Sequence, residues 1–143
     1  MNRIRAVILT LAVGLCFLTT LPAQTAGVSA AEAEAGSVLL RYFDALSQGD
    51  TAALRSLMGG TLLDKRSSLL DNPAYPGHLI SAYGQARYTI TGYSSLDDTT
   101  VSIDATITLS PEESIKKRFL LKMEAGSAMI TPRFLIYDET AEQ

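Results

Sequence analysis

The spacing of apolar residues separates a helical half of the chain from a strand half. Over residues 37–48 the apolar side chains recur at three- and four-residue intervals, which is the spacing of one buried helix face. From residue 86 onward the interval shortens to two, most clearly over residues 100–109, where apolar and polar side chains alternate. Helices followed by hairpin-linked strands predict an α+β domain, with N-terminal helices packed on one face of a mainly antiparallel sheet.

Two helices are predicted on either side of a Gly-Asp corner. Residues 31–36 form a short charged lead-in that favours helix, and Ser37 is placed to cap the helix that follows. Phe43 lies on the apolar stripe of that helix. Gly49 ends the helix, and Asp50 begins the next one through its side-chain oxygen.

Two further helices are predicted before the strands. Thr61 and Asp64 have the spacing of a capping box, which predicts a third helix that ends at Leu70. Residues 71–77 are rich in turn formers and predict a crossing segment. A last helical piece is expected over residues 78–83.

Three more strands are predicted around the alternating run. One precedes the run and ends at a turn over residues 94–98, and another spans residues 115–124. A hairpin loop at residues 125–127 leads to a final strand through Tyr137. Pro132 has no backbone N–H to donate, so it predicts a bulge or an edge in that strand.

The first thirty residues have the pattern of a secretory signal peptide. Two arginines precede residues 6–18, which carry no charge, and small residues follow. A membrane-spanning helix needs about 20 apolar residues, and Pro22 interrupts this run, so an uncleaved anchor is the weaker alternative. Cleavage is predicted after Ala30, with Ala26 as a second option. We therefore expect export to the periplasm or the exterior, with the membrane involved only through the signal peptide.

Removal of this peptide would leave a domain without cysteine. Cys16 lies in the apolar run, and the bulky Leu15 before it departs from the pattern of acylated lipoproteins, so Cys16 is interpreted as one more small apolar residue. The mature chain would carry 10 basic and 15 acidic residues, a net charge of -5. The predicted organisation is a signal peptide at 1–30, a lead-in at 31–36, one domain at 37–138 and a C-terminal tail at 139–143.

Composition excludes several classes of function. The full chain has 12 basic and 15 acidic residues, so it lacks the basic excess that nucleic-acid binding requires. One Cys and one His cannot build a structural zinc site from those two residue types, because such a site needs four ligands. We expect neither a bound metal nor a cofactor.

The helical half resembles a known superfamily. Residues 38–58 are similar to the opening of the nuclear transport factor two-like superfamily, also called the cystatin-like cone fold, in which an aromatic-bearing helix reaches a Gly-Asp corner, here residues 49–50. Residues 118–126 and the strand after them resemble the last hairpin of that superfamily. The likeness extends over about residues 35–138, and it departs at residues 128–130, where members commonly place a Trp that this chain lacks.

This resemblance implies a curved sheet wrapped around a long helix, leaving a cone whose open end often holds a small apolar ligand. The same fold hosts ketosteroid isomerases, polyketide cyclases and dehydratases, together with secreted members of unknown role, so the fold does not decide the function. We expect an exported noncatalytic module that binds a small apolar ligand or a protein partner. A cofactor-free isomerase, cyclase or dehydratase is the alternative. The sequence leaves open whether the chain forms a homodimer through the sheet.

The titratable residues give little support to the enzyme alternative. A cone enzyme needs a carboxylate or a histidine in an apolar pocket, opposite a hydrogen-bond donor. His78 is the only histidine, and no nucleophile can be paired with it. No catalytic residue is assigned, because the four candidate acidic residues are interpreted as solvated or as caps: Asp44, Asp64, Asp71 and Asp104.

Tyrosines are the better candidates for a binding pocket. All six lie in the predicted mature domain, and three of them should converge where a helix face, a helix end and the first strand meet. Their hydroxyls could hydrogen-bond a ligand oxygen while the rings pack on its carbons, although core packing is the simpler interpretation. The candidate pocket-lining residues are Tyr42, His78, Tyr83 and Tyr88.

A basic stripe lies on the strand over residues 115–124. Lys116, Arg118 and Lys122 occupy alternate positions, so they point to one face of the sheet. We interpret this face as a solvated surface or a protected edge, rather than as a site for an anionic partner.

Overall fold

The computed structural model describes residues 27–125 and 132–142, and within them it contains four helices and four strands. The strands form one antiparallel sheet in the order β1-β2-β3-β4, which confirms the predicted α+β class. The predicted signal peptide up to residue 26 and the loop beyond residue 125 lie outside the described residues. The elements are α1 Ala30–Gln48, α2 Thr51–Leu57, α3 Gly60–Leu70, α4 Tyr75–Tyr83, β1 Arg87–Asp97, β2 Thr100–Ser110, β3 Glu113–Glu124 and β4 Arg133–Ala141.

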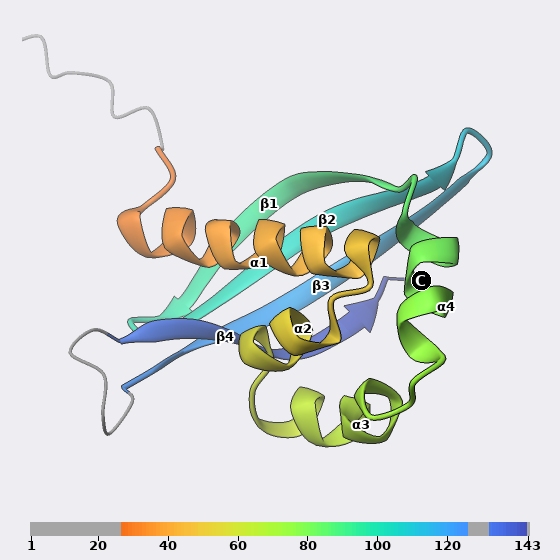
Figure 1. Ribbon diagram of the computed structural model, residues 1–143. Coiled ribbons are helices and arrows are strands. Elements are labelled where there is room, and N and C mark those ends of the chain that lie inside the picture. Colours follow the sequence, from red (N-terminus) through yellow and green to blue (C-terminus); the bar gives the residue numbers. More distant parts are fainter. Residues whose placement is uncertain (1–26, 126–131, 143) are drawn as a thin grey trace, which may run out of the picture.

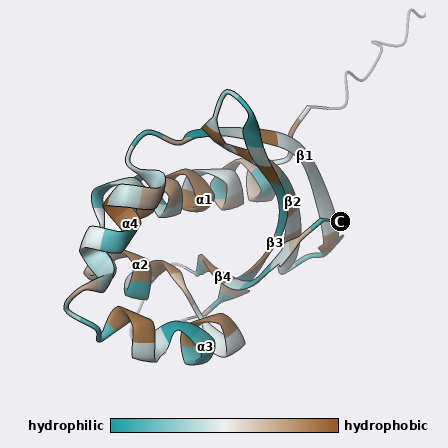
Figure 2. Ribbon diagram, turned by 90° about the vertical axis from the view of Figure 1, so that its right-hand side faces the viewer, coloured by the Kyte–Doolittle hydropathy of each residue, from teal (hydrophilic) through white to brown (hydrophobic). Residues whose placement is uncertain are grey.

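The sheet curves around α1, and the other three helices cover the open side of the curve. Figure 1 shows α1 running across the sheet, and Figure 2 shows the strands bending around it, with α2, α3 and α4 opposite. The core fills this hollow, and its largest fully buried side chains include Phe43, Phe119 and Phe134. Complete burial of a side chain of this size contributes about 1.5 to 3 kcal/mol. α1 is therefore the centre of the core.

The cap of the first helix lies eight residues before the predicted cap. Ser29 is the N-cap: its hydroxyl accepts from the backbone N–H of Glu32 at 3.2 Å, and the Glu32 carboxylate accepts from the backbone N–H of Ser29 at 2.8 Å. The prediction that Ser37 caps the helix is wrong, because Ser37 lies inside α1. Residues 31–36 are rich in Ala and Glu, which favour helix, so the lead-in continues directly into the predicted helix.

The Gly-Asp corner is confirmed. Gly49 has φ of 66°, in the left-handed region, and its backbone N–H donates to the carbonyls that end α1. Asp50 caps α2, because its side-chain oxygen accepts from the backbone N–H of Ala53 at 2.9 Å. The corner turns the chain away from the sheet and starts the helices that cover the hollow.

Gly49→Ala should lower the free energy of unfolding by about 1 to 3 kcal/mol. Left-handed backbone disfavours a side chain, and an added Cβ would lie 2.6 Å from the carbonyl oxygen of Pro76, at the start of α4. Chemical denaturation followed by circular dichroism measures the change. Gly77→Ala is the matched control, because nothing lies within 4 Å of a Cβ there, and it should be neutral or stabilising. Equal stability of the Gly49→Ala protein and the parent would contradict a left-handed Gly49 packed against α4.

The third helix is positioned by β4 rather than by a capping box. Met58 and Gly59 run beside Ile136, and the Gly59 backbone N–H donates to the Ile136 carbonyl at 2.9 Å. The N-cap of α3 is Gly59, which lacks a side-chain cap, and the Thr61 hydroxyl donates to the carbonyl of Tyr137 at 3.1 Å. The predicted capping box is therefore wrong, because the chain pairs with the sheet edge before the helix starts.

The fourth helix begins three residues earlier than predicted. It starts at Tyr75, with Pro76 in its first turn, where the missing N–H and the fixed φ of proline fit a helix start. His78 consequently lies inside α4 rather than at its beginning.

The first strand continues through the predicted turn over residues 94–98. β1 reaches Asp97, and Ser95 pairs with Val101 across the hairpin. The reversal is completed by Asp98 and Thr99, and the Asp97 carboxylate accepts from the Thr99 backbone N–H and hydroxyl, both at 2.8 Å. The turn prediction was wrong because these polar residues pair within the hairpin instead of forming a loop.

Candidate functional site

A charged cluster lies inside the curve of the sheet. The side chain of Glu139 is 8% exposed and accepts a hydrogen bond from the guanidinium of Arg66. The Lys117 Nζ lies 3.6 Å from a Glu139 carboxylate oxygen, and the Tyr42 hydroxyl donates to the same oxygen at 3.1 Å. Buried charges are retained in proteins when they are paired in this way.

A bulge in β4 directs Glu139 into the hollow. Leu121 pairs with Ile136 while Leu120 pairs with Asp138, so Tyr137 is the extra residue on β4. Side chains alternate between the two faces of a strand, and the extra residue shifts that alternation by one. Glu139 therefore stands opposite Phe119, which is fully buried. The strand extends to Ala141, so residues 139–141 belong to the sheet and not to the predicted tail.

The space beside this cluster is small. The interior cavity has a volume of about 20 Å³, which suffices for about one water molecule. The hollow is otherwise filled by the core side chains. The residues around the cavity are Tyr42, Leu46, Met58, Arg66, Tyr75, Tyr83, Ile107, Lys117, Phe119 and Glu139.

A larger recess opens at the surface between α3 and α4. Its volume is about 350 Å³, and it shares Arg66, Tyr75 and Tyr83 with the interior cavity. The rings of Tyr75 and His78 stack along it, with centroids 6.2 Å apart and planes 21° apart. The recess is lined by Arg66, Leu69, Asn72, Ala74, Tyr75, His78, Leu79 and Tyr83.

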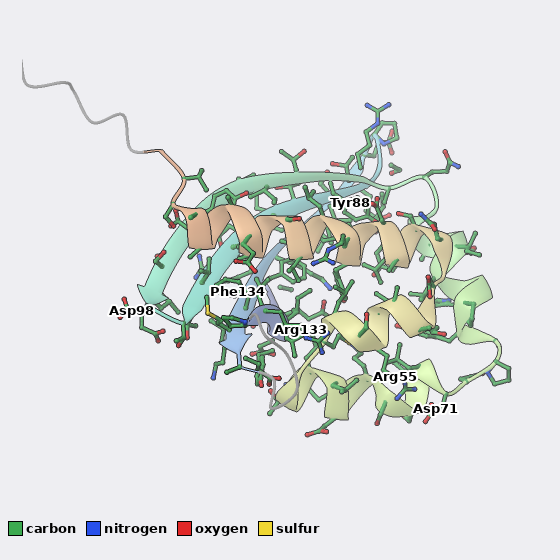
Figure 3. All side chains as sticks on the ribbon, turned by 60° about the vertical axis from the view of Figure 1, so that its left-hand side comes forward. Arg55, Asp71, Tyr88, Asp98, Arg133 and Phe134 are labelled. Atoms are coloured by element: carbon green, nitrogen blue, oxygen red, sulfur yellow. The ribbon has the colours of Figure 1, made fainter. Side chains whose placement is uncertain are left out.

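Three of the four predicted pocket residues lie in this region. Tyr42 lines the interior cavity, His78 lines the recess, and Tyr83 lines both. Tyr88 lies elsewhere, beside α1 (Figure 3), where its ring stacks on Phe43 at 4.3 Å between centroids. Its hydroxyl is 3.1 Å from the Ser47 hydroxyl. The structure thus brings together Tyr42, Tyr83 and His78, and it places Tyr88 in the aromatic core.

The environment of the cluster stabilises its present protonation states. Burial raises the pKa of Tyr42 well above its usual value of 10.0, and the neighbouring Glu139 carboxylate raises it further. For Arg66, burial lowers the pKa, but Glu139 outweighs this effect, so the net pKa is raised. Tyr42 is therefore a neutral hydrogen-bond donor, and Arg66 is a permanent cation.

Tyr42→Phe should reduce the loss of stability at alkaline pH. Because the pKa of Tyr42 is raised in the folded protein, the unfolded chain releases this proton first, so the parent loses stability as the pH rises above about 10. One such group contributes about 1.4 kcal/mol per pH unit. Denaturation midpoints measured between pH 8 and 11 should fall less steeply in the variant. Tyr88, whose pKa burial also raises, leaves a residual slope, but identical slopes in both proteins would contradict the burial of Tyr42.

Sequence reasoning missed the three charged members of the cluster. The strand alternation does indicate Lys117, because Lys116 and Arg118 occupy the outer face of the strand and the residue between them must point inward. Arg66 carried no comparable signal, since the start of α3 was misplaced. Glu139 could not be found by alternation, because the bulge at Tyr137 reverses the pattern.

The outer face of the sheet carries its own ion pairs. Arg118 donates to Asp104 at 2.7 Å and to Glu142 at 2.8 Å. Arg55 and Asp71 form a further pair on the surface of the helical layer and point toward one another (Figure 3). These exposed pairs contribute little to stability, and the basic stripe is solvated as predicted.

No family model, curated protein or solved structure matches the chain. Within residues 27–125 and 132–142, no group of three or more His, Cys, Asp or Glu is arranged to hold a metal ion. No helix in the same ranges is both long and apolar enough to cross a membrane.

Proposed function

We propose that the chain is a noncatalytic small-molecule-binding module, with its binding site in the recess between α3 and α4. The observation that carries this proposal is that the recess shares Arg66, Tyr75 and Tyr83 with the cavity beside the buried cluster. Its volume of about 350 Å³ lies within the range of about 300 to 1,000 Å³ that small-molecule sites occupy. Apolar side chains such as Leu69 and Leu79 line it together with the polar groups of Arg66 and Tyr75. This mixture provides contact area and a few groups that orient a ligand.

The state of Glu139 supports binding rather than catalysis. A general base must lie within hydrogen-bond reach of the proton that it removes. The Glu139 carboxylate is already bonded to Arg66, Lys117 and Tyr42, and the cavity beside it holds about one water. A substrate could reach this carboxylate only if those contacts opened.

One observation favours the enzyme alternative. The Glu139 carboxylate and the Tyr42 hydroxyl are 3.1 Å apart beside one cavity, and a cone enzyme needs a carboxylate and a hydrogen-bond donor in one pocket. Turnover of a bound ligand, abolished by Glu139→Gln in a folded protein, would support that alternative against the binding proposal.

A fragment screen tests the site itself. Amide signals of ¹⁵N-labelled protein would be followed against neutral, anionic and cationic fragments. We expect shifts confined to residues around the recess, such as Leu69, Tyr75 and Leu79. His78→Ala should keep the affinity within about tenfold, because a rim imidazole supplies at most one or two hydrogen bonds. Absence of any hit, or hits only on the outer sheet face, would contradict the proposal.

Export and family membership form part of the same proposal. The two N-terminal arginines and the uncharged run over residues 6–18 support secretion. The curve of the sheet around α1 and the corner at Gly49 and Asp50 support a place in the nuclear transport factor two-like superfamily. Mass spectrometry of the natural protein should find a chain lacking about 23 to 30 N-terminal residues. Recovery of intact Met1 or of lipid-modified Cys16 would contradict export by this route.

A further inference from the structure

We propose that the recess recognises an organic monoanion, specifically a small molecule with a carboxylate on a flat apolar body. This inference rests on the proposed function and names the ligand class of the same site. It places the carboxylate against Arg66, where the recess meets the interior cavity, and the flat body against the ring of Tyr75.

The charges around the site leave one positive charge uncompensated. Among the described residues that line the cavity and the recess, the Lys, Arg, Asp and Glu side chains are Arg66, Lys117 and Glu139. Two cations thus share one carboxylate, in a chain whose net charge is -3. A single negative charge on the ligand would complete the balance, and the partly buried setting strengthens its attraction.

Hydrogen-bond donors at the junction remain for a ligand to use. The Arg66 side chain is 33% exposed. Within the described residues it donates one hydrogen bond, to the Glu139 carboxylate. A guanidinium has five N–H donors in a planar fork that matches a carboxylate. Tyr75 and Tyr83 line both the cavity and the recess, and each carries one hydroxyl donor. These donors are suited to an anion that accepts several hydrogen bonds.

The wall of the recess favours a flat ligand body. The rings of Tyr75 and His78 are nearly parallel, 21° apart, and both residues line the recess. Leu69, which is 38% exposed, supplies aliphatic surface. Flat rings bind well to such surfaces by stacking and by apolar burial. An inorganic anion would use Arg66 and leave this surface uncovered.

A ligand series on the unmodified protein tests the inference. Calorimetric titrations would compare benzoate with the neutral benzamide, the cation benzylamine and inorganic sulfate. We expect benzoate to bind at least tenfold more tightly than each of the other three. Binding of any of them within tenfold of benzoate would overturn the inference. Neutral fragments in the recess without benzoate binding would overturn it and leave the proposed function standing, whereas no binding by any fragment would contradict both.

Variants identify the group that holds the carboxylate. Arg66→Gln should weaken benzoate binding at least tenfold, and Arg66→Lys should weaken it less, because the charge stays while the planar fork is lost. Arg55→Gln is the matched control, since Arg55 is also a paired arginine but lies outside the recess. Unchanged benzoate affinity in folded Arg66→Gln protein would overturn the inference. If that variant unfolds, the ligand series on the unmodified protein still tests the inference.

Discussion

Replacing Phe43 with alanine is expected to lower the free energy of unfolding by about 3 to 5 kcal/mol. The Phe43 side chain is 1% exposed. Its ring stacks on Tyr88 and meets Phe119 edge-on, with centroids 4.3 and 5.6 Å away. The substitution would open a cavity where α1 meets two strands. A domain of this size has a total stability of about 5 to 15 kcal/mol, so partial unfolding and low solubility are expected.

The matched control lies on the same helix. Leu40 is 51% exposed on the outer side of α1, so Leu40→Ala should change the stability by no more than about 0.5 kcal/mol. Thermal and chemical denaturation of both variants separate the effect of the core from the effect of helix propensity. If Phe43→Ala melted within a degree or two of the parent, α1 could not be the centre of the core.

Glu139→Gln is expected to produce the second large loss, of about 3 kcal/mol. The amide keeps the shape of the carboxylate but removes the negative charge that Arg66 and Lys117 share. Removing one partner of a buried ion pair leaves an uncompensated charge, which costs about 3 to 5 kcal/mol. The lower end applies because Arg66 is 33% exposed and Lys117 is 19% exposed. Chemical denaturation at neutral pH measures the loss.

Two further variants show whether charge is the cause. Lys117→Met in the Glu139→Gln background should recover part of the stability, because it removes one of the two unpaired cations. Asp71→Asn deletes an exposed carboxylate whose partner is Arg55, and it should leave the melting temperature almost unchanged. If Glu139→Gln and Asp71→Asn were equally mild, the cluster would not be electrostatically important.

The parts of the fold that sequence could predict are those set by local periodicity. The stripe through Phe43 and the alternation over β2 each repeat often enough to define a buried face. The corner at Gly49 and Asp50 was also predictable, because both residue types have a local conformational reason to be there. These features depend on interactions within a few residues along the chain.

The candidate site depends on long-range pairing and was therefore harder to predict. The bulge at Tyr137 is stabilised by a distant segment: an added Cβ on Gly60 would lie 2.3 Å from the Tyr137 ring, which shows how closely the two pack. Nothing near Glu139 in sequence signals this reversal. The contacts of Glu139 with Arg66 and Tyr42 span 73 and 97 residues. Of the predicted residues, Tyr42, Tyr83 and His78 reach the site because α1 and α4 pack against each other there.

Because Ser29 caps α1, the position of the predicted signal-peptide cleavage would determine the local order of this helix. Cleavage after Ala30 would remove the Ser29 hydroxyl that satisfies the Glu32 backbone N–H. It would also create a positive α-amino group at the positive end of the helix dipole. Loss of such a cap costs about 1 kcal/mol, and Glu32 also holds the Ser95 hydroxyl on β1 at 3.1 Å. A protease that cuts after Ala26 would release a chain with an intact first turn, whereas one that cuts after Ala30 would release a chain whose N-terminal end frays away from β1.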